Sequence, residues 1–91
     1  MKLLLSSRKT TVIVLDDDRF VCRALKTQLQ ILGFGVLVFH SAESLLSGNL
    51  PDGEVCLLAD IYLPGMNGNE LCRHLYAAGV HLPTILMSGR E

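Results

Sequence analysis

Acidic side chains directly follow two apolar segments of the sequence. Asp16, Asp17 and Asp18 come after "VIVL", and Asp60 comes after "VCLLA". Continuous apolar runs of this length are typical of strands that are buried on both faces. Carboxylates repel one another and are rarely buried without a partner. The ends of these two segments are therefore candidate functional positions.

The two acidic positions can meet at one edge of a parallel sheet. Ligands bind beyond the carboxyl ends of such strands, where the strand order reverses. If the two strands are neighbours there, Asp16, Asp17 and Asp60 converge on one pocket. A hard cation offsets their repulsion, and Mg²⁺ prefers oxygen ligands and usually keeps some of its waters. The sequence therefore predicts a Mg²⁺ site with room for a phosphate oxygen. Asp18 directly precedes a helical pattern and is expected to cap that helix.

A hydroxyl group adds to this predicted site. Ser88 follows the apolar run "TILM", again at the end of a predicted strand. Its hydroxyl could donate a hydrogen bond to a phosphoryl oxygen. A cation, a carboxylate nucleophile and a hydroxyl donor together suit phosphoryl transfer to a carboxylate, which gives an acyl phosphate.

Strands and helices alternate along the chain and must position these groups. Helical spacing over 19–32 places Val21, Leu25, Leu29 and Leu32 on one stripe. The predicted strands are 11–15, 35–39, 54–60 and 83–88, and the predicted helices are 19–32, "AESLL" after Ser41, and a segment that Asn67 and Glu70 begin as a capping box. A β-α-β-α-β-α-β order predicts an α/β fold with a parallel sheet covered on both faces.

Length and composition bound the function. The 91 residues allow one small domain, and 49% hydrophobic with 19% charged residues indicate a globular chain. A net charge of −1 without a basic block predicts that this domain binds neither nucleic acid nor a membrane. The three widely spaced cysteines are interpreted as core thiols of a reducing compartment, which predicts a cytoplasmic location. Residues 1–10 are interpreted as an N-terminal extension and 11–91 as the domain.

Three motifs carry a family resemblance. The stretches "VIVLDDD", "LADIYLPGMNGNEL" and "TILMSGRE" resemble the receiver domain of bacterial two-component response regulators, from about Thr11 to Glu91. The resemblance implies a flavodoxin-like three-layer fold with strand order 2-1-3-4. It also implies a signalling switch rather than an enzyme.

The resemblance assigns a role to each candidate residue. Asp60 aligns with the aspartate that accepts a phosphoryl group from a sensor histidine kinase. Asp16 and Asp17 align with the acid pair of the Mg²⁺ site, and the backbone carbonyl of Tyr62 is implied as a further ligand. Ser88 aligns with the switch hydroxyl. The stretch "GFGVLVFHSAESLL" further resembles receivers that precede a DNA-binding output domain.

The sequence also departs from the family. Complete receivers continue with a fifth strand, which brings a lysine and an aromatic residue, and with two more helices. We therefore expect a C-terminally incomplete domain that lacks the fifth strand and last two helices. Such a chain is expected to self-associate through the fourth strand and the uncovered sheet face.

Two other functions remain open at this point. One is a receiver-like protein-interaction module that is never phosphorylated, which the missing lysine region favours and the clustered acids disfavour. The other is a Mg²⁺-dependent phosphohydrolase, a function that requires a general acid two residues after the nucleophile. Tyr62 occupies that position after Asp60, whereas Asp18 occupies it after Asp16. His40, His74 and His81 show no ligand spacing and are interpreted as surface or boundary residues.

Overall fold

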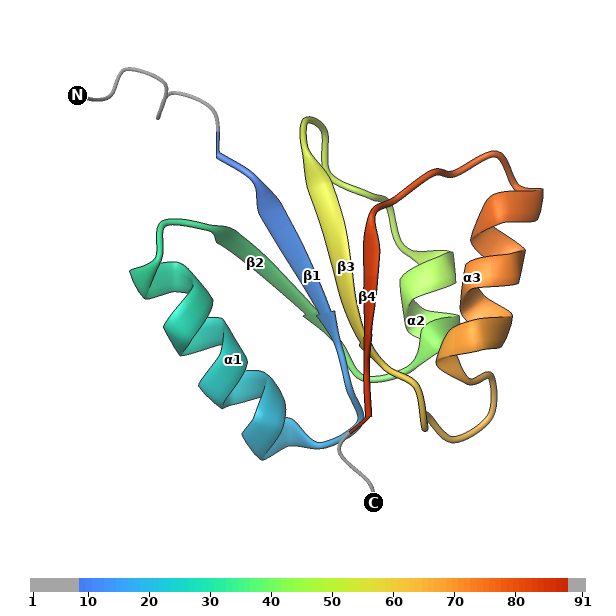
Figure 1. The fold of residues 1–91 in the computed structure, drawn as a ribbon, viewed down its shortest axis with the longest axis horizontal. Helices are drawn as coiled ribbons and strands as arrows, with labels where there is room; N and C mark the ends of the chain where they lie inside the picture. Colours follow the sequence, from blue (N-terminus) through green and yellow to red (C-terminus); the bar gives the residue numbers. More distant parts are fainter. Residues whose placement is uncertain (1–8, 89–91) are drawn as a thin grey trace.

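A four-stranded parallel sheet forms the centre of the molecule in a computed structural model, which describes residues 9–88 (Figure 1). The strands lie in the order β2-β1-β3-β4, as the family resemblance implies. They are β1 (Thr11–Leu15), β2 (Gly35–Phe39), β3 (Val55–Asp60) and β4 (Thr84–Met87). The predicted extension falls mostly on residues 1–8, which lie outside the described part of the chain.

Helices cover both faces of the sheet, which gives the predicted three layers. They are α1 (Arg19–Ile31), α2 (Ala42–Ser47) and α3 (Gly68–Ala77). Helix α1 lies on one face, and α2 and α3 lie together on the other (Figure 1). Right-handed crossovers produce this arrangement when the chain moves outward from β1 to β2 and then back to β3 and β4. The strand order reverses between β1 and β3.

The core consists of two apolar layers on either side of β1. Val12 and Val14 face α1 and pack with Cys22. Ile13 and Leu15 face the opposite layer, whose other buried members are Ala42, Leu45, Leu57, Ala59, Leu63, Leu71 and Leu75. Because successive strand residues point to opposite faces, a strand buried on both sides must be apolar throughout. This explains the uninterrupted "VIVL" that precedes the acids.

Capping residues fix where the helices begin. Asp18 accepts hydrogen bonds from the amides of Phe20 and Val21 at the start of α1, as predicted. At the start of α3, the Asn67 side chain accepts from the Glu70 amide at 2.9 Å, and the Glu70 carboxylate accepts from the Asn67 amide at 3.0 Å. The predicted capping box is therefore confirmed, and it fixes the end of the loop that leaves β3.

The predicted stripe of α1 is partly wrong. Leu25 and Leu29 pack on the sheet, but the buried residue of the first turn is Cys22, while Val21 is 37% exposed. Leu32 caps the helix beyond its last turn and is 70% exposed. Positions three and four residues before Leu25 lie on nearly the same helix face, so spacing alone could not choose between Cys22 and Val21.

The β4 side of the α1 face is open. Ile85 pairs with Leu58 in register and shares its face, yet it is 65% exposed. Within residues 9–88, β4 is hydrogen-bonded to β3 alone and forms an edge of the sheet. Over the same range, no helix has both the length and the apolar character needed to cross a bilayer.

Candidate functional site

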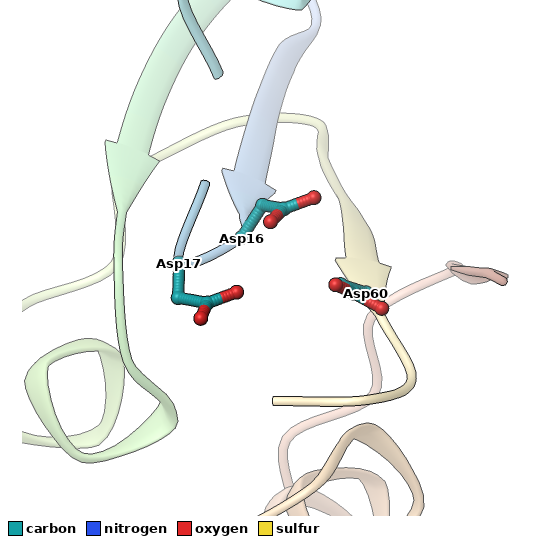
Figure 2. A group of neighbouring side chains, drawn as sticks. All are labelled: Asp16, Asp17 and Asp60. Atoms are coloured by element: carbon teal, nitrogen blue, oxygen red, sulfur yellow. The ribbon is translucent and has the colours of Figure 1, made fainter. Parts of the chain in front are cut away.

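The carboxyl ends of β1 and β3 bring the acidic residues together. Leu15 pairs with Ala59 in the parallel register, so Asp16 and Asp60 directly follow paired positions. Carboxylate oxygens of Asp16, Asp17 and Asp60 all lie within 4.8 Å of one another. The three side chains point into a common space at this edge (Figure 2). The predicted convergence is therefore present.

Asp16 is the buried member of the group. Its side chain is 5% exposed, and its Oδ1 accepts a hydrogen bond from the Asp18 amide at 2.9 Å. Its own amide donates to the Phe39 carbonyl at 3.1 Å, which continues the pairing of β1 with β2. Burial raises the pKa of this carboxyl, and the charges of Asp60, Asp17 and Asp18 raise it further against the opposing amide hydrogen bond.

Asp60 ends β3 and is half-buried. The Tyr62 amide donates to its Oδ1 at 2.9 Å, which restrains the rotation of the carboxylate. The adjacent Ile61 amide donates to the Met87 carbonyl at 2.9 Å and ties this position to β4. The backbone next to Asp60 is therefore held to β4 by a hydrogen bond.

Gly68 lets α3 approach the Asp60 backbone closely. A Cβ atom built at Gly68 would lie 3.2 Å from the Asp60 carbonyl oxygen and 3.0 Å from Leu86 Cδ2. The Asp60 carbonyl oxygen belongs to the backbone and cannot easily move away from an added side chain. A side chain at this position would therefore crowd the backbone that carries Asp60.

The donor set fits a magnesium ion. Three carboxylates supply the hard oxygen ligands that Mg²⁺ takes, and two of them are exposed enough to share the ion with water or a phosphate. Burial is the main cause of the raised pKa of Asp16, and without a cation the neighbouring negative charges of the cluster raise this pKa further. Asp16, Asp17 and Asp60 are therefore the residues of this chain that would hold Mg²⁺.

The remaining predicted site residues lie at the same end of the sheet. Ser88 directly follows β4 and is exposed, and Tyr62 directly follows the Asp60–Ile61 segment. An open cleft of about 650 Å³ borders the cluster; it is lined by Asp17, Ile61, Tyr62, Leu63, Pro64, Gly65, Asn67 and Asn69. The roles of the Ser88 hydroxyl and the Tyr62 carbonyl stay predictions.

One contact was missed by sequence reasoning. His40 was interpreted as a surface or boundary residue, and it is half-buried, but its Nδ1 lies 3.0 Å from the Asp16 carbonyl oxygen. The Cys22 thiol donates to the same oxygen at 3.2 Å, and burial raises the pKa of that thiol. The available signal was position, because His40 follows β2 as Asp16 follows β1, and Leu15 pairs with Phe39.

The sequence profile of the response regulator receiver domain matches residues 12–91, which include all of the sheet except the first residue of β1, and all three acids. The chain belongs to this family. Receiver domains are the signalling modules of response regulators, so the predicted family and fold are confirmed.

Individual relatives agree with this assignment. Nodulation protein W of Bradyrhizobium diazoefficiens is 33% identical over 92% of the chain, and the transcriptional regulatory protein FixJ of Azorhizobium caulinodans is 36% identical over 86%. The chain spans 37% of the length of each of these two proteins.

Solved structures of response regulators superpose closely on this receiver domain. The structure of the response regulator StyR matches with a TM-score of 0.84 at 35% identity, covering 91% of this chain and 42% of that one. The crystal structure of FixJ-N matches with a TM-score of 0.81 at 31% identity, covering 89% and 65%.

Proposed function

We propose that this receiver domain accepts a phosphoryl group on Asp60 and does so with Mg²⁺ bound. The observation that carries the proposal is the convergence of Asp16, Asp17 and Asp60 within 4.8 Å at the switch point of the sheet. The backbone carbonyl of Tyr62 is the proposed fourth ligand from the protein.

The proposed reaction forms an acyl phosphate. A carboxylate oxygen of Asp60 attacks the phosphorus of a phosphohistidine on a sensor histidine kinase. The new P–O bond replaces the P–N bond, and the departing imidazole keeps the bonding electron pair and takes a proton. Bound Mg²⁺ would supply positive charge for the phosphoryl oxygens in this reaction. Asp16 and Asp17 would hold the ion, while the Tyr62 amide keeps the Asp60 carboxylate oriented.

We propose that phosphorylation changes the surface of the domain and that a partner protein recognises the changed surface. Phosphorylation adds charge and strong acceptor oxygens at the end of β3, and the Ser88 hydroxyl is the proposed donor to them. Relatives include transcriptional regulatory proteins, so a DNA-binding output domain outside these residues is proposed to respond to the signal. The domain itself is proposed to bind no nucleic acid and no membrane, and to act in the cytoplasm.

A small phosphodonor tests this proposal against its two alternatives. The full chain is incubated with acetyl phosphate in the presence of Mg²⁺ or of a chelator, and its intact mass is recorded. We expect the mass of one phosphoryl group to be added only with Mg²⁺. Absence of uptake with Mg²⁺ would favour the protein-interaction module, and repeated turnover of a generic phosphate ester would favour the phosphohydrolase.

A further inference from the structure

We propose that His40 is a positioning residue for the acidic cluster. Its imidazole holds the peptide group between Asp16 and Asp17 and thereby sets the direction of the Asp17 carboxylate. This inference rests on the proposed Mg²⁺-dependent function, in which Asp17 is a ligand.

Three groups hold the backbone of Asp16 in place. His40 Nδ1 lies 3.0 Å from the Asp16 carbonyl oxygen, and Cys22 Sγ lies 3.2 Å from the same oxygen. On the other side, the Asp16 amide donates to the Phe39 carbonyl at 3.1 Å. The residue is thus restrained from β2 and from α1 at once.

The contact fixes the tautomer of the ring. A carbonyl oxygen can only accept, so Nδ1 of His40 must carry the hydrogen. Cys22 Sγ lies 3.7 Å from that nitrogen, and the thiol donates to the carbonyl as well. The Asp16 carbonyl therefore accepts two hydrogen bonds, one from His40 and one from Cys22.

The restraint passes to Asp17 through the peptide bond. A peptide unit is planar, so fixing the Asp16 carbonyl also fixes the plane that contains the nitrogen and Cα of Asp17. The Asp17 side chain is exposed, and packing does not hold its carboxylate against the cluster. Its approach to Asp16 and Asp60 consequently depends on the backbone that His40 and Cys22 orient.

A matched set of variants separates positioning from folding. His40→Asn keeps an amide donor where Nδ1 lies, and His40→Leu removes the donor. His74→Leu is the control, because His74 is an exposed residue of α3. We expect His40→Leu to lower Mg²⁺ affinity by about two- to tenfold, the value of one hydrogen bond, and His40→Asn to restore most of it. The amides of residues 16–18 report Mg²⁺ binding by NMR, and the ¹⁵N spectrum of His40 reports the tautomer.

Each outcome decides the inference. The inference would be overturned by an unchanged Mg²⁺ affinity in His40→Leu. It would also be overturned by a wild-type spectrum in which Nδ1 of His40 carries no hydrogen. If His40→Leu does not fold, His40→Gln replaces it, because its amide lies beyond the Nδ1 position. A folded wild-type chain that gives no response to Mg²⁺ refutes the proposed function instead. The Asp17 amide chemical shift, measured without Mg²⁺, then tests positioning by itself. A change in this shift in His40→Leu that is reversed in His40→Asn supports positioning, and an identical shift in wild type and His40→Leu overturns it.

Discussion

Asp16 directly follows β1 and Asp60 ends the neighbouring parallel strand β3, and their carboxylates approach within 4.8 Å although the residues are far apart in sequence. Asp16 is buried at this end and Asp60 is half-buried. The sheet therefore presents two like charges side by side, together with the exposed Asp17. A bound divalent cation would offset the electrostatic cost of this arrangement.

Removal of the Asp17 charge is expected to weaken Mg²⁺ binding. Loss of groups that only support metal ligands already costs about 10- to 100-fold in affinity, so Asp17→Asn should cost at least about tenfold. Asp18→Asn is the matched control, because asparagine is an equally good helix cap. Calorimetric titration of the two variants with Mg²⁺ measures the difference. Equal affinities in both variants would remove Asp17 from the site.

The buried carboxyl of Asp16 predicts a pH dependence of stability. Burial raises the pKa of Asp16 above its ordinary value of 3.8, so the folded protein holds this proton more tightly than the unfolded chain. Without Mg²⁺, the contribution of Asp16 to stability therefore falls as the pH rises from about 3.8 through the raised pKa, and stays low at neutral pH.

Asp16→Asn should remove this penalty. In a chelating buffer at neutral pH, the variant should melt at a higher temperature than the wild type, by about 4–8 °C for each kcal/mol recovered. Its melting temperature should also lose the dependence on pH that Asp16 causes. Asp52→Asn in an exposed loop serves as the control. A lower melting temperature for Asp16→Asn under these conditions would contradict the assigned direction.

The close approach at Gly68 predicts a local cost for any side chain there. Gly68→Ala should destabilise the fold by about 1–3 kcal/mol, the usual cost of overpacking, because the Asp60 carbonyl and Ile61 Cα crowd the new methyl group. Asn69→Ala, at the next and exposed helix position, should change stability by less than about 0.5 kcal/mol. Urea unfolding gives both values, and a neutral Gly68→Ala would refute the packing argument.

The exposed strand edge predicts self-association of the 91-residue chain. Within residues 9–88, Ile85 is 65% exposed and β4 is hydrogen-bonded to β3 alone, so this edge of the sheet can pair with another chain. Ile85→Thr keeps a β-branched residue but removes apolar surface, so it should shift the chain toward monomer. Ile31→Thr is a control at a similarly exposed position on α1, with 73% exposure. Sedimentation equilibrium distinguishes the two, and a wild-type chain that stays monomeric at all concentrations would contradict this prediction.

Sequence reasoning reached the fold because the pattern is strong at each level. Apolar runs, caps and glycines define the seven elements of residues 9–88, and crossover handedness then leaves few topologies. The convergence of Asp16 with Asp60 requires β1 and β3 to be neighbours, which the strand order implied by the family resemblance supplies. The predicted stripe of α1 was partly wrong, because Cys22 and Val21 occupy adjacent positions on nearly the same face. The choice between them depends on how the helix is rotated against β1 and β2.

The contact of His40 with Asp16 depends on strand register. Both residues directly follow paired strands, but their proximity is evident only once Leu15 is known to pair with Phe39. A histidine at a strand end otherwise has many possible partners. The direction of its Nδ1 toward a carbonyl is a property of side-chain packing that residue spacing does not contain.

Locating the phosphoryl group on the chain tests the central claim most directly. The wild type, Asp60→Asn and Asp18→Asn are each treated with acetyl phosphate and Mg²⁺, and the modified peptide is identified by mass spectrometry after borohydride trapping of the acyl phosphate. We predict that wild type and Asp18→Asn are modified at Asp60 and that Asp60→Asn is not modified. Equal uptake by Asp60→Asn, or trapping of the group at another residue of the wild type, would contradict the account.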